Sequence, residues 1–217
     1  MNARAGILRR PARALPGARR WSWSLSAALP LLPLVAIGLA ERTGWRGRWG
    51  LPLLVTYGLI PLLDAGIGAD ARNPPEDAVP ALEGDRFYRW LTYLAVPLHY
   101  LVLAAGIAYV VLGTDGWLEA LAVTLSLAFA GGLAINVGHE LGHKDSGLEK
   151  RLAQLALAVT GYGHFRVEHN LGHHATVATP EDHASARMGE SVYRFVRREI
   201  PGGLRRGWAL EGRRLAR

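Results

Sequence analysis

Long apolar blocks, rather than amphipathic periods, dominate the hydrophobic pattern of this chain. A helix needs about 20 consecutive apolar residues to cross the hydrocarbon of a bilayer, and several of the blocks approach that length. The pattern therefore predicts an all-α fold, an integral membrane helical bundle with four spans. We expect these transmembrane helices within residues 21–138, at about 21–40, 51–67, 90–112 and 117–137.

Proline and length modify the first two predicted spans. Pro30 and Pro33 lie inside the first span and are expected to bend it, because proline removes a backbone donor. The second span is short, so it is expected to stand nearly upright in the bilayer or to continue as a broken helix. Residues 68–89 mix charges with prolines and are expected to form a polar loop.

The charge distribution favours a membrane surface over nucleic acid. The net charge is +7, but the arginines cluster beside the apolar blocks, where lipid headgroups lie. Residues 1–20 contain six arginines and no acid, which indicates a basic cytoplasmic N-terminal segment. A secretory signal peptide is the alternative interpretation of this end. Four crossings from a cytoplasmic N-terminus would return residue 139 to the cytoplasmic side, as Lys144 and Lys150 also indicate.

Two histidine clusters follow the fourth predicted span. The first is His139-Glu140-Leu141-Gly142-His143, and the second is Glu168-His169-Asn170-Leu171-Gly172-His173-His174. Each contains two histidines four residues apart, a spacing that places both imidazoles on one face of a helix. His174 would point about 100° around the same helix, toward a second ion. We therefore predict metal ligation by five residues: His139, His143, His169, His173 and His174.

The absence of cysteine from the whole sequence leaves histidine and carboxylate as the ligands for this metal. Residues 139–190 are thus the expected histidine-box region on the cytoplasmic side. Its apolar piece 152–160 is too short to span and is expected to lie along the inner interface. Residues 191–217 are rich in arginine and are interpreted as a basic segment leading to a further membrane helix, with a docking face for an acidic partner as the alternative.

A zinc metalloprotease is a second interpretation of the first cluster. Residues 139–143 fit the HExxH pattern, in which two histidines bind zinc and the glutamate, here Glu140, activates water. Such an enzyme needs one further ligand, whereas the second cluster offers three histidines, and this surplus disfavours zinc. In the metal-centre interpretation, Glu140, Glu168 and Asp182 are acceptors that orient the ligating imidazoles.

Two histidines lie outside the clusters and are expected to have other roles. His99 falls deep in the third span and is interpreted as a packed or hydrogen-bonded residue rather than a ligand. His164 is placed beside the centre, in packing or as a residue behind the ligands.

Several motifs together resemble the membrane-bound alkane 1-monooxygenase (alkane hydroxylase) family. Beside the two histidine clusters they are Asn73-Pro74-Pro75-Glu76, Gly161-Tyr162-Gly163-His164-Phe165 and Val177-Ala178-Thr179-Pro180-Glu181-Asp182. This combination separates the chain from the fatty acid desaturases, which share only the general histidine-box arrangement. A desaturase-like di-iron enzyme remains an alternative.

The resemblance implies a specific activity and set of partners. It implies a six-span bundle, two non-haem iron ions held by nine histidines, and terminal hydroxylation of n-alkanes with dioxygen and electrons delivered by rubredoxin. By motif match, the five histidines named above would be ligands. It further implies a bacterial cytoplasmic (inner) membrane protein surrounded by lipid. The family's later histidine motifs are absent from this sequence, so the chain is expected to be the N-terminal portion of such an enzyme, inactive alone.

Overall fold

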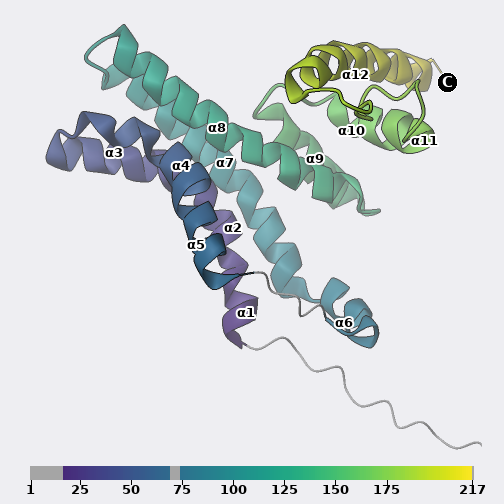
Figure 1. Ribbon diagram of the computed structural model, residues 1–217, viewed down its shortest axis with the longest axis horizontal. Coiled ribbons are helices and arrows are strands. Elements are labelled where there is room, and N and C mark those ends of the chain that lie inside the picture. Colours follow the sequence, from purple (N-terminus) through teal and green to yellow (C-terminus); the bar gives the residue numbers. More distant parts are fainter. Residues whose placement is uncertain (1–16, 69–73, 217) are drawn as a thin grey trace, which may run out of the picture.

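The computed structural model describes residues 17–68 and 74–216, and within these residues it contains helices and no strand (Figure 1). Residues 1–16 of the predicted basic segment 1–20 lie outside the described residues, and its last four residues belong to α1 (Gly17–Ser22). Four helical segments are long and apolar enough to cross a membrane: Arg20–Thr43, Gly47–Ile67, Arg86–Leu112 and Trp117–Gly142. The predicted all-α bundle with four spans is therefore confirmed, and the chain is a multi-pass membrane protein.

The first two spans are helices of changing pitch. In the first, the 3-10 turn η1 (Leu29–Leu31) separates α2 (Ser24–Ala28) from α3 (Leu32–Thr43), and Pro30 lies in this turn, as expected from its missing donor. The second span is one continuous helical stretch, Gly47–Ile67, which begins before the predicted residue 51 and is long enough to cross without a break. Its pieces are η2 (Arg46–Gly50), α4 (Leu51–Leu54), the π turn η3 (Val55–Leu59) and α5 (Ile60–Ile67).

The third and fourth spans, α7 (Arg86–Leu112) and α8 (Trp117–Gly142), are long helices that pack against each other (Figure 1). Helix α7 begins four residues before the predicted Trp90, because Asp85 caps it: its Oδ1 accepts a hydrogen bond from the Phe87 amide at 2.8 Å. Part of the predicted polar loop is also helical, as η4 (Glu76–Ala78) and α6 (Val79–Glu83). Helix α8 continues past residue 137, so it carries the first histidine in its last turn.

Beyond α8 the chain forms shorter polar elements. Helix α9 (Gly147–Ala158) packs on α8, and Glu149 in its first turn ties it to α7 by accepting a hydrogen bond from the Tyr93 hydroxyl at 2.8 Å. Then follow α10 (Phe165–Glu168), the π turn η5 (His169–His173), α11 (His174–Thr176) and α12 (Val192–Leu215).

Helix α12 lies along α10 in Figure 1, at the end of the molecule that carries the histidines. It approaches closely because Gly202, Gly203 and Gly207 are buried on the contact face. A Cβ at Gly207 would come within 3.2 Å of the Glu168 side chain. Most of the predicted basic segment 191–217 is thus a helix folded back on the histidine region.

Candidate metal centre

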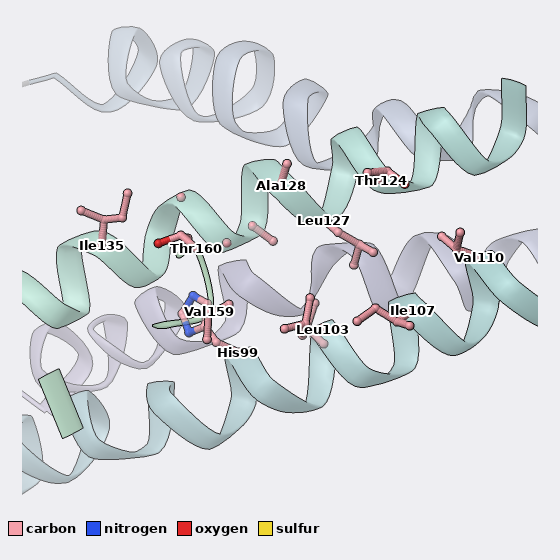
Figure 2. A pocket seen from close by; sticks show the side chains of 14 residues that line it. His99, Leu103, Ile107, Val110, Thr124, Leu127, Ala128, Ile135, Val159 and Thr160 are labelled. Atoms are coloured by element: carbon pink, nitrogen blue, oxygen red, sulfur yellow. The ribbon is translucent and has the colours of Figure 1, made fainter. Parts of the chain in front are cut away.

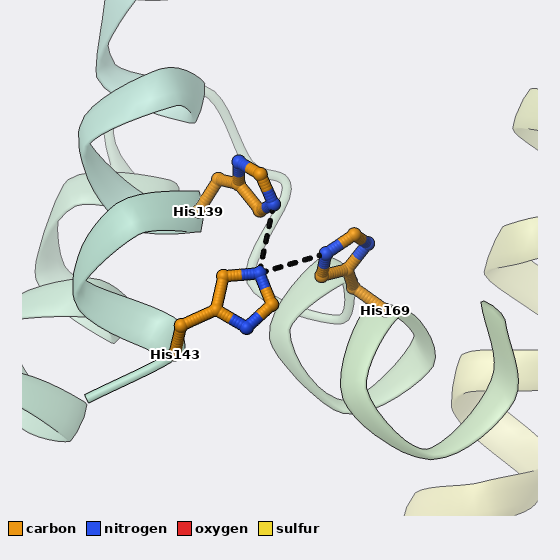
Figure 3. A group of neighbouring side chains, drawn as sticks. All are labelled: His139, His143 and His169. Atoms are coloured by element: carbon orange, nitrogen blue, oxygen red, sulfur yellow. Dashed lines mark hydrogen bonds between the residues drawn. The ribbon is translucent and has the colours of Figure 1, made fainter. Parts of the chain in front are cut away.

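The last turn of α8 supplies the first two imidazoles. His139 lies in that turn and His143 caps it, and their Nε2 atoms are 2.9 Å apart (Figure 3). Four residues of α-helix bring the two side chains onto one face, as the spacing predicts. The structure therefore confirms the geometry expected for the first cluster.

A π turn presents the second cluster differently from the prediction. The Nε2 atom of His169 lies 3.2 Å from that of His143, and the Nε2 atom of His174 lies 3.1 Å from that of His169. The expected partner of His169 was His173, four residues on, but η5 is wound with bonds between residues five apart. This winding brings the Nε2 atom of His174 to that of His169, instead of pointing His174 about 100° away toward a separate ion, while the ring of His173 also stacks on that of His169 with centroids 5.2 Å apart.

This arrangement fits a metal ion held by nitrogen ligands. The Nε2 atoms of His139, His143 and His169 are among ligand atoms that all lie within 4.8 Å of one another. Two nitrogens bound to one ion at about 2.0–2.1 Å would be separated by about 2.9–3.4 Å in octahedral or tetrahedral geometry. The observed separations of 2.9, 3.1 and 3.2 Å match that range. The donors are imidazole nitrogens, which suit iron and zinc alike.

The surroundings of two imidazoles in the cluster, those of His143 and His169, disfavour their charged form. Burial, followed by the neighbouring imidazoles of His139 and His174, lowers the pKa of His169 to about 4. Burial and the same two neighbours also lower the pKa of His143. Both rings are thus in the neutral form that binds a metal at physiological pH, with no proton to displace.

The His173 ring is held by a carboxylate. Its Nδ1–H donates to Asp182 Oδ2 at 2.8 Å, and its ring stacks on that of His169 with centroids 5.2 Å apart. This hydrogen bond leaves Nε2 free to act as a ligand, in the arrangement that orients metal-bound histidines in proteins. The expected hydrogen bond between Asp182 and an imidazole is confirmed.

Asp182 is almost fully buried, with 1% of its surface exposed. Burial alone would raise its pKa, but hydrogen bonds from Ser185, Arg206, the Ala184 amide and His173 outweigh burial and hold the pKa well below its usual range. A buried carboxylate that stays ionised provides a fixed acceptor for His173.

Arg206 is a residue that sequence reasoning missed. Its Nη2 donates to Asp182 Oδ1 at 2.9 Å, and its Nε donates to the buried Glu168 Oε1 at 2.8 Å. The π turn comes close enough that a Cβ at Gly172 would lie 2.7 Å from Arg206 Nε. Arg206 of α12 therefore links two acids: Asp182, which orients His173, and Glu168, which precedes His169.

A second missed arginine closes the loop between α11 and α12. Arg198 donates to the carbonyls of His183 and Ser185, each at 2.9 Å, and to Glu190 Oε2 at 2.7 Å. A spacing of four residues separates Arg198, Gly202 and Arg206. This helical spacing places both arginines on the glycine face of α12, and it was the signal in the sequence that they face inward rather than toward lipid. We call Arg198 and Arg206 the arginine clasp.

The other acids and histidines singled out in the sequence lie elsewhere. Glu140 is exposed and pairs with Lys144 at 2.6 Å, and Glu168 pairs with Arg206, so the prediction that these two acids orient imidazoles is wrong. His164 packs against Tyr162, with ring centroids 4.6 Å apart. His183 packs beneath Gly202, where an added Cβ would meet its ring at 2.5 Å.

A cavity of about 530 Å³ lies between α7 and α8, and Val159 and Thr160 close one side of it (Figure 2). Its walls are almost wholly apolar, and Ile135 of the wall lies one helical turn before His139. His99 also lines it, and its Nδ1 lies 2.7 Å from the Ala95 carbonyl oxygen. The expectation that His99 is packed and hydrogen-bonded is confirmed.

Known proteins related to this chain share one name. This chain is 52% identical, over 92% of its own length, to an alkane 1-monooxygenase of Ectopseudomonas oleovorans. It is 51% identical, also over 92% of its length, to alkane 1-monooxygenase 1 of Alcanivorax borkumensis. It is 36% identical over 92% to an alkane 1-monooxygenase of Acinetobacter baylyi. Residues 115–217 also match the fatty acid desaturase family model. The chain spans about half the length of these relatives: 50%, 49% and 50% respectively.

Proposed function

We propose, from the premise that this chain is homologous to the alkane 1-monooxygenases, that it forms part of a non-haem di-iron enzyme which hydroxylates the terminal methyl of n-alkanes. The observation that carries the proposal is the convergence of imidazole nitrogens from two separate elements beside an apolar cavity. Dioxygen would be the oxidant and rubredoxin the electron donor.

In this proposal the five histidines would approach the metal in two ways. His139, His143, His169 and His174 would present Nε2 to the metal from α8 and from the turns that follow α10. His173 would present Nε2 from a ring that Asp182 holds. Two iron ions bound there would supply the activation of dioxygen.

The residues of the spans would bind the alkane and exclude water from it. The cavity between α7 and α8 is lined by side chains such as Leu103, Val110 and Leu127, which offer an unbranched chain dispersion contacts and no competing hydrogen bonds. Its Ile135 end points along α8 toward His139, so an alkane lying in it would present one terminal carbon toward the centre.

We place the protein in the bacterial cytoplasmic membrane, with the centre on the cytoplasmic side. Lys144, Lys150 and Arg151 follow the end of α8, in agreement with the excess of basic residues in cytoplasmic segments. The arginines of the turn at 41–50 oppose this orientation. One of them, Arg48, is neutralised by Glu119 through an ion pair of 2.6 Å, which reduces the cost of placing it outside.

Metal analysis of the purified chain is the first test. The proposal expects about two iron ions per chain, whereas about one zinc ion would support the metalloprotease and negligible metal a non-catalytic membrane protein. His169→Ala should lower the iron content, because His169 neighbours both His143 and His174. His183→Ala is the matched control, since that ring packs on Gly202 away from the centre. Unchanged iron in His169→Ala would refute the assignment of the second cluster.

Alkane-dependent oxygen consumption tests the reaction when this chain is combined with the half of a relative that it does not match, and rubredoxin and a reductase supply electrons. A desaturase-like di-iron enzyme is the second candidate, which the match of residues 115–217 favours. The two differ in product: the monooxygenase gives a primary alcohol from an n-alkane, and the desaturase gives a double bond in an acyl chain.

A further inference from the structure

The imidazole of His99 has one nitrogen with a partner and one without. Nδ1 lies 2.7 Å from the Ala95 carbonyl oxygen, which can only accept, so Nδ1 carries the proton and donates it. In a neutral imidazole with Nδ1 protonated, Nε2 is an acceptor. The residue is 2% exposed, and Nε2 has no hydrogen-bond partner among the residues that the structure describes.

The His99 side chain, which carries this acceptor, is part of the wall of the apolar cavity (Figure 2). Buried polar atoms in proteins nearly always have a partner, because an acceptor that loses water without gaining a donor is destabilising. The remaining walls are hydrocarbon, apart from the hydroxyls of Thr124 and Thr160, which donate to the carbonyls of Ala120 and Leu157. A ligand that fills the cavity can therefore supply the missing donor.

The position of His99 along the cavity selects the shape of that ligand. His99 lies with Ile135, Val159 and Thr160 at one end, and Val110 and Thr124 lie at the other (Figure 2). The His99 end is the one nearer to His139, which follows Ile135 by one helical turn. A matching ligand has one donor at its head and an unbranched apolar tail.

We propose that His99 makes this cavity a binding site for primary alcohols, with the alcohol O–H donating to Nε2 and the alkyl tail lying toward Val110. The inference rests on the proposed function in one respect, because terminal hydroxylation of an alkane produces such an alcohol. The site would then hold its product more tightly than its substrate, and the head group of that product would stay beside the metal centre.

Binding to the purified, iron-free chain in detergent tests this without turnover. The probes are 1-decanol and its isomer 1-methoxynonane, which has the same atoms but no O–H. Isothermal titration should give the alcohol about three- to tenfold higher affinity, the value of one neutral hydrogen bond. His99→Leu should abolish this preference. Val110→Ala is the matched control: it enlarges the far end of the cavity and should change the affinity for both probes alike.

A spectroscopic measurement keeps the inference testable if His99→Leu fails to fold. In protein labelled with ¹⁵N-histidine, 1-decanol should shift the Nε2 resonance of His99 toward that of a hydrogen-bonded nitrogen, and 1-methoxynonane should not. The more conservative His99→Gln identifies the resonance. Equal affinities for the two probes, or an unmoved Nε2 resonance, would overturn the inference. Alcohol preference without alkane oxidation, when the chain is combined with the half of a relative that it does not match, would refute the proposed function alone.

Discussion

The spanning half of the molecule and the polar half beyond α8 hold together by different means. In the spans, small and branched apolar residues such as Ala36, Ala40 and Val123 form the core, and large apolar side chains such as Leu62 and Val111 point outward. In the polar half, Asp182 and Glu168 are buried, 1% and 3% exposed, and each is bonded to Arg206.

This difference matches what each half has to do in the proposed enzyme. Apolar packing is non-directional, so it can enclose a chain-like ligand without fixing each atom. Metal ligands need imidazoles held within a fraction of an ångström, and hydrogen bonds to ionised groups supply that direction. If the comparison is right, substitutions at the buried ionic groups of the polar half should disturb metal binding, and those in the spans should disturb stability or ligand binding and leave metal binding intact.

The largest expected effect is at the arginine clasp. Arg206→Met leaves two buried carboxylates without their counter-charge, which should cost about 3–5 kcal/mol in the free energy of unfolding. Metal content should fall as well, because Asp182 loses a group that fixes it beneath His173. Denaturant unfolding in micelles and metal analysis measure the two effects. Arg205→Met, at an exposed neighbour, should change neither, and full metal content in Arg206→Met would contradict the comparison.

A substitution inside the spans should act on stability only. A Cβ at Gly106 would lie 2.3 Å from the Leu127 side chain, so Gly106→Ala should overpack the α7–α8 contact and cost about 1–3 kcal/mol. Gly38→Ala, where nothing lies within 4 Å, should instead stabilise α3 by up to about 1 kcal/mol. Metal content should be unchanged in both. Equal effects of Gly106→Ala and Gly38→Ala on thermal stability would show that the α7–α8 contact has room for the added methyl group.

The junction between the halves should give a smaller, pH-dependent effect. A hydrogen bond from Ser146 is the main cause that lowers the pKa of Glu149; burial opposes it, and Tyr93 and Arg89 assist. A carboxyl with a lowered folded pKa stabilises the protein above its unfolded value of about 4.3, and this contribution is lost as the pH falls through the folded value. Glu149→Gln should remove about 1 kcal/mol at pH 7 and flatten this acid dependence. If the free energy of unfolding of Glu149→Gln depended on pH as it does in the parent chain, Glu149 would not stabilise the contact between α7 and α9 as its bond to Tyr93 indicates.

The smallest effect is expected on the surface of the polar half. Glu140 and Lys144 form an exposed pair, so Glu140→Gln should change stability by no more than about 0.5 kcal/mol and leave the metal content intact. In a metalloprotease the same substitution would remove the general base and abolish peptide hydrolysis. Hydrolysis of a model peptide by the parent chain and its loss in Glu140→Gln would therefore favour the zinc alternative.

The spanning half could be predicted from the sequence in outline, because hydropathy reports directly on helices that face lipid. Its helix ends could not. Helix α7 starts at Arg86, where Asp85 caps it, and the charges of Arg86 and Arg89 in its first turn interrupt the apolar signal. Likewise α8 runs to Gly142, since a helix can continue through polar residues once it leaves the hydrocarbon.

The centre could be predicted in its residues and only partly in its geometry. The spacing of His139 and His143 was sufficient, because α-helical periodicity applies there. The spacing did not predict that His174 turns toward His169, since a change from α to π hydrogen bonding moves a side chain around the helix axis without changing the sequence spacing. Arg198 and Arg206 were grouped with surface charge, because composition does not reveal which side of a helix an arginine faces.

The arginine clasp also has a consequence for the order in which the site is completed during synthesis. Asp182 and Arg206 are 24 positions apart, and ribosomes deliver the earlier residue first. His173 therefore meets its carboxylate before that carboxylate has its guanidinium. Asp182 gains its full set of partners only after α12 has been translated and has folded back, so in the proposed enzyme the metal site would be completed late in synthesis.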